Sequence, residues 1–310
     1  MSYLLNYSSF GKWGGIWAKS IEIKYLLKDE DIIYKTCIDK LESIDKPELL
    51  SNIYFEDCEM QVMPNLMRFI NLNLIGFKNV IFENKKIEFN NYLSSNLNLK
   101  KMIFLNTNLH NIFESLNGMN LTYLRLENID CSNTDSDDIN KLTSLEELYI
   151  INCKYSNLIN VSNLTNIKIL QLKNLGLSNI IGLDKLVNMF NLDITYNNIN
   201  NINDITNLNN LKYLYINNNH IKKLCDCDKL GNLKYLICSN NEIDNFDNIL
   251  NLENLEVLDI VNNNCKHLPN LLKLNNLNYE RLNVNWSKIQ TIDGMKGFGL
   301  IKNIIMSKNN

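Results

Sequence analysis

The sequence predicts an α/β-type repeat solenoid: a curved coil with a parallel β-sheet on its concave side and short 3₁₀ or extended segments on its convex side. Three observations predict this fold. Apolar residues recur every 22 residues, each period holds a short stretch with strand-like alternation, and an asparagine often follows that stretch at a fixed position. A constant period of this length is typical of stacked supersecondary units.

The repeat is most regular in the second half of the chain. Within each unit, apolar residues occupy positions 1, 4, 6, 11, 14, 17 and 20. Upstream, Leu99 starts a unit of 22 residues and Leu121 one of 24, weaker units start at Leu50 and Met67, and downstream the register slips by two to Tyr279. Six consecutive units start 22 residues apart, at Leu145, Ile167, Met189, Leu211, Leu233 and Leu255.

Each unit begins with a predicted strand. Positions 4 and 6 alternate with positions 3, 5 and 7, so the first pair points into the core and the second set points outward. About 13 residues then remain for the return path, which is too short for a crossover helix with two turns. The convex side is therefore expected to be extended or 3₁₀.

Position 9 is predicted to hold a ladder of asparagines. The chain bends inward there, and a carboxamide can pair the buried backbone groups of neighbouring units. Smaller polar residues fill the slot in other units (Cys58, Thr107, Cys153 and Ser287), and apolar residues fill it at Ile75, Ile129 and Leu175. Asparagines elsewhere, such as Asn217 and Asn218, are assigned to base composition or to solvation of the strand edge. The predicted ladder consists of Asn197, Asn219, Asn241, Asn263 and Asn309.

The unit pattern LxxLxLxxNxIxxIxxLxxLxx resembles the leucine-rich repeat, specifically the 22-residue Sds22-like and internalin-like class. The resemblance covers roughly residues 50–310. It implies a curved leucine-rich repeat solenoid and a non-enzymatic protein that binds a partner protein on its concave face.

Two domains are predicted. Residues 1–48 form an N-terminal cap of one strand and a short helix that ends before Pro47, and the alternative is that the stretch FGKWGGIW is a docking segment. Residues 49–310 form the repeat array, with an irregular segment near 82–98 and a truncated final repeat.

Composition excludes several classes. The formal net charge is −3 and no run of Lys or Arg exceeds two, which argues against nucleic-acid binding. No stretch has the apolar length of a membrane span or the pattern of a secretory signal. Eight cysteines without a paired spacing indicate a reducing compartment. We expect a cytoplasmic protein with no membrane association, and the nucleus stays open.

Catalytic and metal chemistry find no support. The three histidines, His110, His220 and His267, fall in different columns of the repeat, and no carboxylate pair accompanies them. The Cys225–Cys227 pair lies on the opposite side of the core from Cys238, so four convergent zinc ligands are not expected. We therefore expect no enzyme activity, no cofactor and no metal, although a weak alternative places an enzyme site in the N-terminal cap.

Outward-facing aromatic residues supply the candidate binding surface. Tyr213, Tyr215, Tyr235 and Ile237 occupy positions 3 and 5 of adjacent units, where side chains are not needed for the core. Aromatic residues also suit strands in general, which is the alternative reading. The candidate partner-binding residues are Tyr213, Tyr215, Tyr235, Ile237, Asp193, Asp259 and Tyr149.

Two functional hypotheses follow. The first is a protein–protein interaction scaffold that is a monomer outside its complex and grips a partner on its concave face. The second is a regulatory subunit of a phosphatase or ubiquitin ligase complex, which would act by contacting a catalytic partner.

Overall fold

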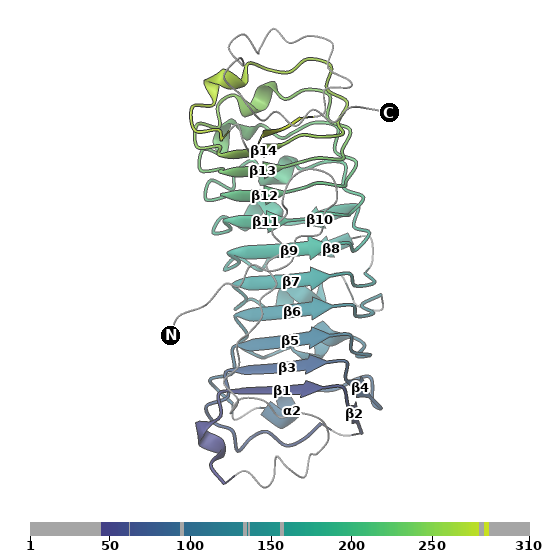
Figure 1. Cartoon of the computed structure of the whole chain (residues 1–310). Helices are drawn as coiled ribbons and strands as arrows, with labels where there is room; N and C mark the ends of the chain where they lie inside the picture. Colours follow the sequence, from purple (N-terminus) through teal and green to yellow (C-terminus); the bar gives the residue numbers. More distant parts are fainter. Residues whose placement is uncertain are drawn as a thin grey trace.

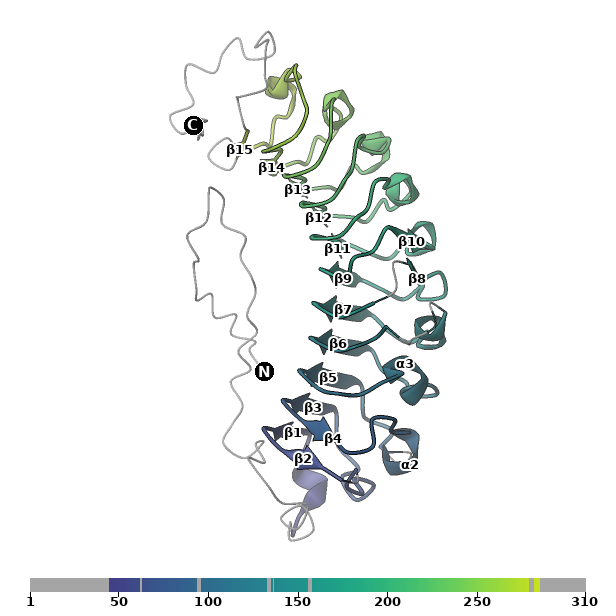
Figure 2. The ribbon, with the colours of Figure 1, turned by 90° about the vertical axis from the view of Figure 1, so that its right-hand side faces the viewer.

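A curved solenoid is formed by the described residues of the computed structural model, which are 45–61, 63–93, 96–132, 135, 137–155, 158–278 and 282–284. One parallel sheet of 11 strands lines its concave side (Figures 1 and 2). The strands, in their order in the sheet, are β1 (Asn52–Glu56), β3 (Leu74–Lys78), β5 (Lys101–Leu105), β6 (Tyr123–Glu127), β7 (Glu147–Ile151), β9 (Ile169–Lys173), β11 (Asn191–Asp193), β12 (Tyr213–Tyr215), β13 (Tyr235–Ile237), β14 (Val257–Asp259) and β15 (Leu282–Asn283).

The strand register follows the repeat. Position 4 of one unit pairs with position 4 of the next, as in Leu192 with Leu214 and Leu214 with Leu236. These leucines are fully buried, because positions 4 and 6 point into one core that runs continuously along the solenoid. The predicted fold class is confirmed.

Short elements form the convex side, as the length of the return path requires. Two small parallel sheets pair β2 (Glu59–Met60) with β4 (Ile81–Phe82) and β8 (Leu158–Asn160) with β10 (Asn179–Ile181). Two single helical turns, α2 (Asn90–Leu93) and α3 (Ile112–Ser115), lie in the first half. The 3₁₀ turns are η1 (Pro47–Leu49), η2 (Asp138–Lys141), η3 (Leu183–Lys185), η4 (Asn203–Ile205), η5 (Cys227–Lys229), η6 (Asp247–Ile249) and η7 (Leu271–Lys273).

The expected start of a unit at Met67 is wrong. Strand β3 pairs Leu74 with Asn52, so the second unit starts at Leu72, and Met67 lies in a turn. Ile75 consequently sits at position 4 of that unit and is fully buried, instead of filling the position-9 slot. The apolar spacing alone misplaced this start because the chain before Leu72 contains additional buried residues that mimic the strand pattern.

The irregular segment near 82–98 is the convex part of a longer unit that runs from residue 72 to residue 98. Phe82 and Phe89 pack against Phe77, with ring centroids 5.5 and 5.9 Å apart. Phe77 also stacks on Phe55 and Phe104, which occupy position 6 of the neighbouring units. The additional residues therefore enlarge the core beneath the sheet.

The slip near the C-terminus lies between Asn278 and Leu282. The amide of Asn278 donates to the carbonyl of Glu256, 2.9 Å away, which keeps the 22-residue spacing. Leu282 then pairs with Leu258, 24 residues earlier. Most of the predicted cap, Asn309 and the truncated final repeat lie outside the described residues. Within the part of the chain that is described, no helix has the length and apolar character needed to cross a membrane.

Candidate functional site: the concave face

The inner asparagines hold the chain where it leaves each strand. Asn219 accepts a hydrogen bond from the amide of Ile199 (3.0 Å) and donates to the carbonyls of Ile194 (2.9 Å) and Ile216 (3.1 Å). One carboxamide thus links neighbouring units, and all its partners are backbone groups. Asn197, Asn241 and Asn263 make equivalent bonds and are also buried.

A second row, at position 8, has a different role. Ten successive strand ends adopt a left-handed backbone there, with φ between 52° and 59°. Asparagine and aspartate tolerate this conformation better than other non-glycine residues, and nine of the ten positions hold them. Asn218, expected only to solvate the edge, therefore makes the turn possible. The row is Asp57, Asn79, Asn106, Asn128, Asn152, Asn174, Tyr196, Asn218, Asn240 and Asn262.

A third row, at position 22, ties the outside of successive units together. Asn210 donates to the carbonyl of Val187 (2.9 Å), and Asn232 donates to that of Asn209 (2.7 Å). Asn166, Asn188 and Asn254 make the same type of bond. The assignment of these asparagines to base composition alone is therefore corrected, because three positions of the unit use the carboxamide.

The structure brings the predicted aromatic patch together. Tyr213 pairs with Tyr235 across β12 and β13, and their ring centroids are 5.1 Å apart. Tyr215 pairs with Ile237 beside them, and all four side chains are half-buried. Loss of solvent, with the nearby Asp193 carboxylate, raises the pKa of Tyr215 to about 12. The phenol therefore stays neutral and can act as a hydrogen-bond donor at physiological pH.

The two flanking aspartates are buried and do not form an exposed rim. Asp193 forms an ion pair with Lys173, at 3.0 Å. Asp259 accepts from the amide of Val261, at 3.1 Å, and burial raises its pKa to about 6 despite this bond and those from Ser239 and Asn283. Their charges are held in a water-poor part of the concave surface.

Tyr149 lies apart from that patch, in a second cluster that the sequence analysis did not identify. Its ring lies 5.2 Å from that of Tyr123, and the Arg125 guanidinium sits 5.9 Å from the Tyr149 ring centroid. The relevant signal was present in the position-3 and position-5 columns but was not summed across strands. We call this the concave apolar cluster; its buried members are Leu74, Ile103, Tyr123 and Tyr149, and its half-buried members are Tyr54, Leu105, Ile151 and Ile169.

Tyr196 is a further candidate at the strand ends. It occupies position 8 with φ of 59°, where the other units use asparagine or aspartate, and it is 57% exposed. An aromatic residue in the left-handed region carries backbone strain, which often marks a functional position. A departure from the position-8 pattern was the signal that could have identified it.

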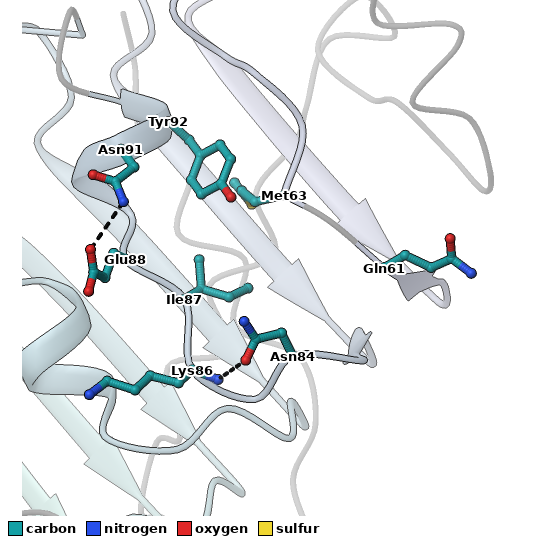
Figure 3. A pocket seen from close by; sticks show the side chains of 8 residues that line it. All are labelled: Gln61, Met63, Asn84, Lys86, Ile87, Glu88, Asn91 and Tyr92. Atoms are coloured by element: carbon teal, nitrogen blue, oxygen red, sulfur yellow. Dashed lines mark hydrogen bonds between the residues drawn. The ribbon is translucent and has the colours of Figure 1, made fainter.

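A hollow of about 450 Å³ lies outside the concave face, between the first two units (Figure 3). Met63, Ile87 and Tyr92 point toward one another, whereas Gln61 and the Lys86 ammonium point away. Lys86 also pairs with Glu114 at 3.2 Å. The lining does not converge on a common point, so this hollow offers no arrangement for specific chemistry.

The histidine and cysteine positions carry no catalytic geometry within the described chain. His220 is exposed and its Nδ1 lies 3.3 Å from the Glu242 carboxylate. The thiols of Cys225 and Cys227 are buried with their sulfur atoms 3.6 Å apart. No group of three or more His, Cys, Asp or Glu side chains placed to hold a metal occurs among the residues described.

Similarity to known proteins is seen only at the level of structure: no family model and no curated protein matches the sequence. An internalin (InlF) from Listeria monocytogenes matches with a TM-score of 0.58 and 16% identity, over 86% of this chain and 89% of its own. The functional domain of InlJ from Listeria monocytogenes, which includes a cysteine ladder, matches with a TM-score of 0.64 and 21% identity, over 80% of this chain and 51% of its own.

A plant peptide hormone receptor, RGFR1 in complex with RGF2, also matches, with a TM-score of 0.61 and 16% identity, over 84% of this chain and 45% of its own. Similarities at this identity establish the fold, and the Sds22-like class stays a prediction. With its 22-residue period, inner row of asparagines and parallel concave sheet, the chain is a leucine-rich repeat protein.

Proposed function

We propose that the chain is a non-enzymatic scaffold that binds a protein partner on its concave face. The observation that carries the proposal is the composition of that face. Two aromatic and apolar surfaces, the concave apolar cluster and the Tyr213–Tyr235 patch, point outward from strands whose core positions are already filled. Aromatic residues of this kind dominate the binding energy of protein interfaces.

The geometry favours an elongated ligand. Outward side chains repeat at the spacing of adjacent strands, about 4.8 Å, so an extended segment can contact several units in succession. The structurally similar plant receptor is a peptide hormone receptor in complex with RGF2, which supports a peptide or protein segment as the class of ligand. Tyr196, exposed at the strand ends, would contact a ligand that extends beyond the sheet.

A cytoplasmic location and a monomeric state outside the complex complete the proposal. The described cysteines are thiols, including the Cys225 and Cys227 pair at 3.6 Å, which suits a reducing compartment. Among the described outward residues of β11–β15, the charged ones are acidic, Asp193 and Asp259, which suits a protein ligand better than a nucleic acid.

Affinity capture from native extract, followed by titration of the purified partner, tests the proposal. The Tyr213→Ala/Tyr215→Ala/Tyr235→Ala variant is expected to weaken binding at least tenfold while its thermal unfolding changes little. A matched variant on the convex side, Ile181→Ala/Val187→Ala, should bind normally. Equal affinity of the concave variant and the intact chain would contradict the proposal. A catalytic partner whose activity changes on binding would instead identify the regulatory-subunit function.

A further inference from the structure

The concave face is drier than its position predicts. A sheet that covers the core with one face normally leaves its other face in water. In Figure 2, however, none of the described helices and strands lies over that second face. Ten of its outward side chains are nevertheless at most 8% exposed: Leu74, Ile103, Tyr123, Tyr149, Asp193, Thr195, Ser239, Val257, Asp259 and Asn283.

Polar atoms on the same face lack partners. The Thr195 hydroxyl and the Asn191 side-chain carbonyl are buried and make no hydrogen bond within the part of the chain that is described. Thr195 is only 4% exposed. Asp259 likewise has no basic partner among the described residues. Buried polar groups are normally satisfied, so these atoms indicate that another segment completes this surface.

We propose that residues 1–28 of this chain lie along the concave face as an intramolecular ligand. Their aromatic side chains pack on the concave apolar cluster and on the Tyr213–Tyr235 patch. This inference rests on the proposed function, because the same surface receives the partner. The segment consequently has to leave before a partner binds, and it sets the chemistry of that partner as aromatic and basic.

The composition of the segment matches the surface. Residues 1–28 contain four lysines against one glutamate, and none of the repeat positions claims them. The described C-terminal half of the concave face has the opposite charge, from Asp193 and Asp259. The six aromatic residues of the segment are Tyr3, Tyr7, Phe10, Trp13, Trp17 and Tyr25.

The connection is long enough. The described chain begins at Asp45, beside β1 at one end of the sheet. Residues 29–44, if extended, span about 50 Å at roughly 3.3 Å per residue. From β1 to β12 there are seven strand spacings, or about 34 Å at roughly 4.8 Å each. The segment therefore reaches both aromatic surfaces.

Tryptophan fluorescence of the full chain tests the inference. The chain has three tryptophans, and Trp286→Phe leaves Trp13 and Trp17, both in the proposed ligand segment, as the only emitters. On that background we expect blue-shifted emission and weak quenching by acrylamide. Adding Ile103→Asp/Ile169→Asp, which places charges in the concave apolar cluster, should shift the emission to that of exposed indole and increase quenching several-fold.

Two controls make the result decisive. Ile181→Asp/Val187→Asp introduces the same charges at exposed convex positions and should leave the emission unchanged. Ile169→Asp alone, at a half-buried position, should produce part of the shift with an unaltered circular dichroism spectrum. Exposed emission in the Trp286→Phe background would overturn the inference. A shift caused by Leu49→Asp but not by the concave variants would assign the segment to the end of the solenoid and would also overturn it.

The experiment needs no partner, so its failure is separate from failure of the proposed function. A segment that does not dock leaves partner capture by the concave face unaffected. Conversely, a docked segment together with capture that ignores the Tyr213, Tyr215 and Tyr235 substitutions would retain the inference and reject the binding surface.

Discussion

At the residue scale, one side chain serves three purposes according to its position in the unit. At position 9 the carboxamide pairs buried backbone groups, as Asn219 does. At position 8 it permits a left-handed backbone, and at position 22 it donates to the preceding unit, as Asn210 does. Only the first role could be predicted, because it follows from burial. The second depends on backbone angles and the third on a contact between units, neither of which appears in the apolar pattern.

Tyr196→Asn should stabilise the protein. The left-handed conformation costs an ordinary side chain about 1–2 kcal/mol, and asparagine largely avoids this cost. Tyr196 is 57% exposed, so little apolar packing is lost. We expect the free energy of unfolding in urea to rise by about 1 kcal/mol.

The reverse substitution provides the control. Asn218→Tyr places the same ring at the same position of the next unit, where φ is 58°, and should lower stability by about 1 kcal/mol. If both substitutions change stability in the same direction, backbone strain is not the cause.

Asp259 should make stability depend on pH. Burial raises its pKa to about 6, above the value in the unfolded chain, so the folded state favours the protonated carboxyl. The contribution of this group is therefore greatest below pH 4 and is lost as the pH rises through 6. Asp259→Asn should be more stable than the intact chain at pH 7, with the difference shrinking toward pH 5, in urea unfolding at each pH. A constant difference between the two proteins across this range would contradict the assignment.

At the element scale, the strands were predictable and the first convex segments were not. From Leu145 onward the period fixes each strand, because inward and outward positions repeat without a shift. Near Met67 the same rule failed, since buried residues of an irregular convex path share the strand spacing. The Tyr213 and Tyr235 contact followed from register alone. The concave apolar cluster did not, because its members come from units of 22, 24 and 27 residues whose alignment requires the paired strands.

Gly182 should be essential for one of the convex connections. It has φ of 86°, just before η3, and an added Cβ would lie 2.4 Å from the Cα of Ser162. Gly182→Ala is therefore expected to lower the free energy of unfolding by about 2 kcal/mol or more, since neither the backbone angle nor the neighbouring backbone can adapt cheaply. Gly231→Ala, where a Cβ meets nothing within 4 Å, should change stability by less than about 0.5 kcal/mol. Equal effects in thermal melts would remove the steric explanation.

At the scale of the whole molecule, each unit contacts mainly its neighbours, so the solenoid behaves as a one-dimensional stack. Deleting residues 211–232 joins Asn210 to Leu233 and restores every 22-residue bond, including a new pair between Asn241 and the carbonyl of Ile194. We expect cooperative urea unfolding, with a slope reduced in proportion to the lost surface.

Deleting only half of that unit, residues 211–221, should be more harmful. It removes β12 and Asn219 but leaves a convex segment without a strand. This shorter deletion is therefore expected to have the lower unfolding midpoint, although it removes fewer residues. The opposite order would show that length, and not completeness of the unit, decides stability.

The inner asparagines also determine how this protein ages. Asparagine is among the heat-labile residues, because its amide hydrolyses to a carboxylate. At Asn219 that single change would replace a donor with an oxygen anion facing the carbonyls of Ile194 and Ile216. The same injury can occur at Asn197, Asn241 and Asn263, where the nitrogen is likewise held by carbonyl oxygens. Slow covalent damage, accumulating one amide at a time, would therefore set the working lifetime of a fold that is otherwise able to refold after stress.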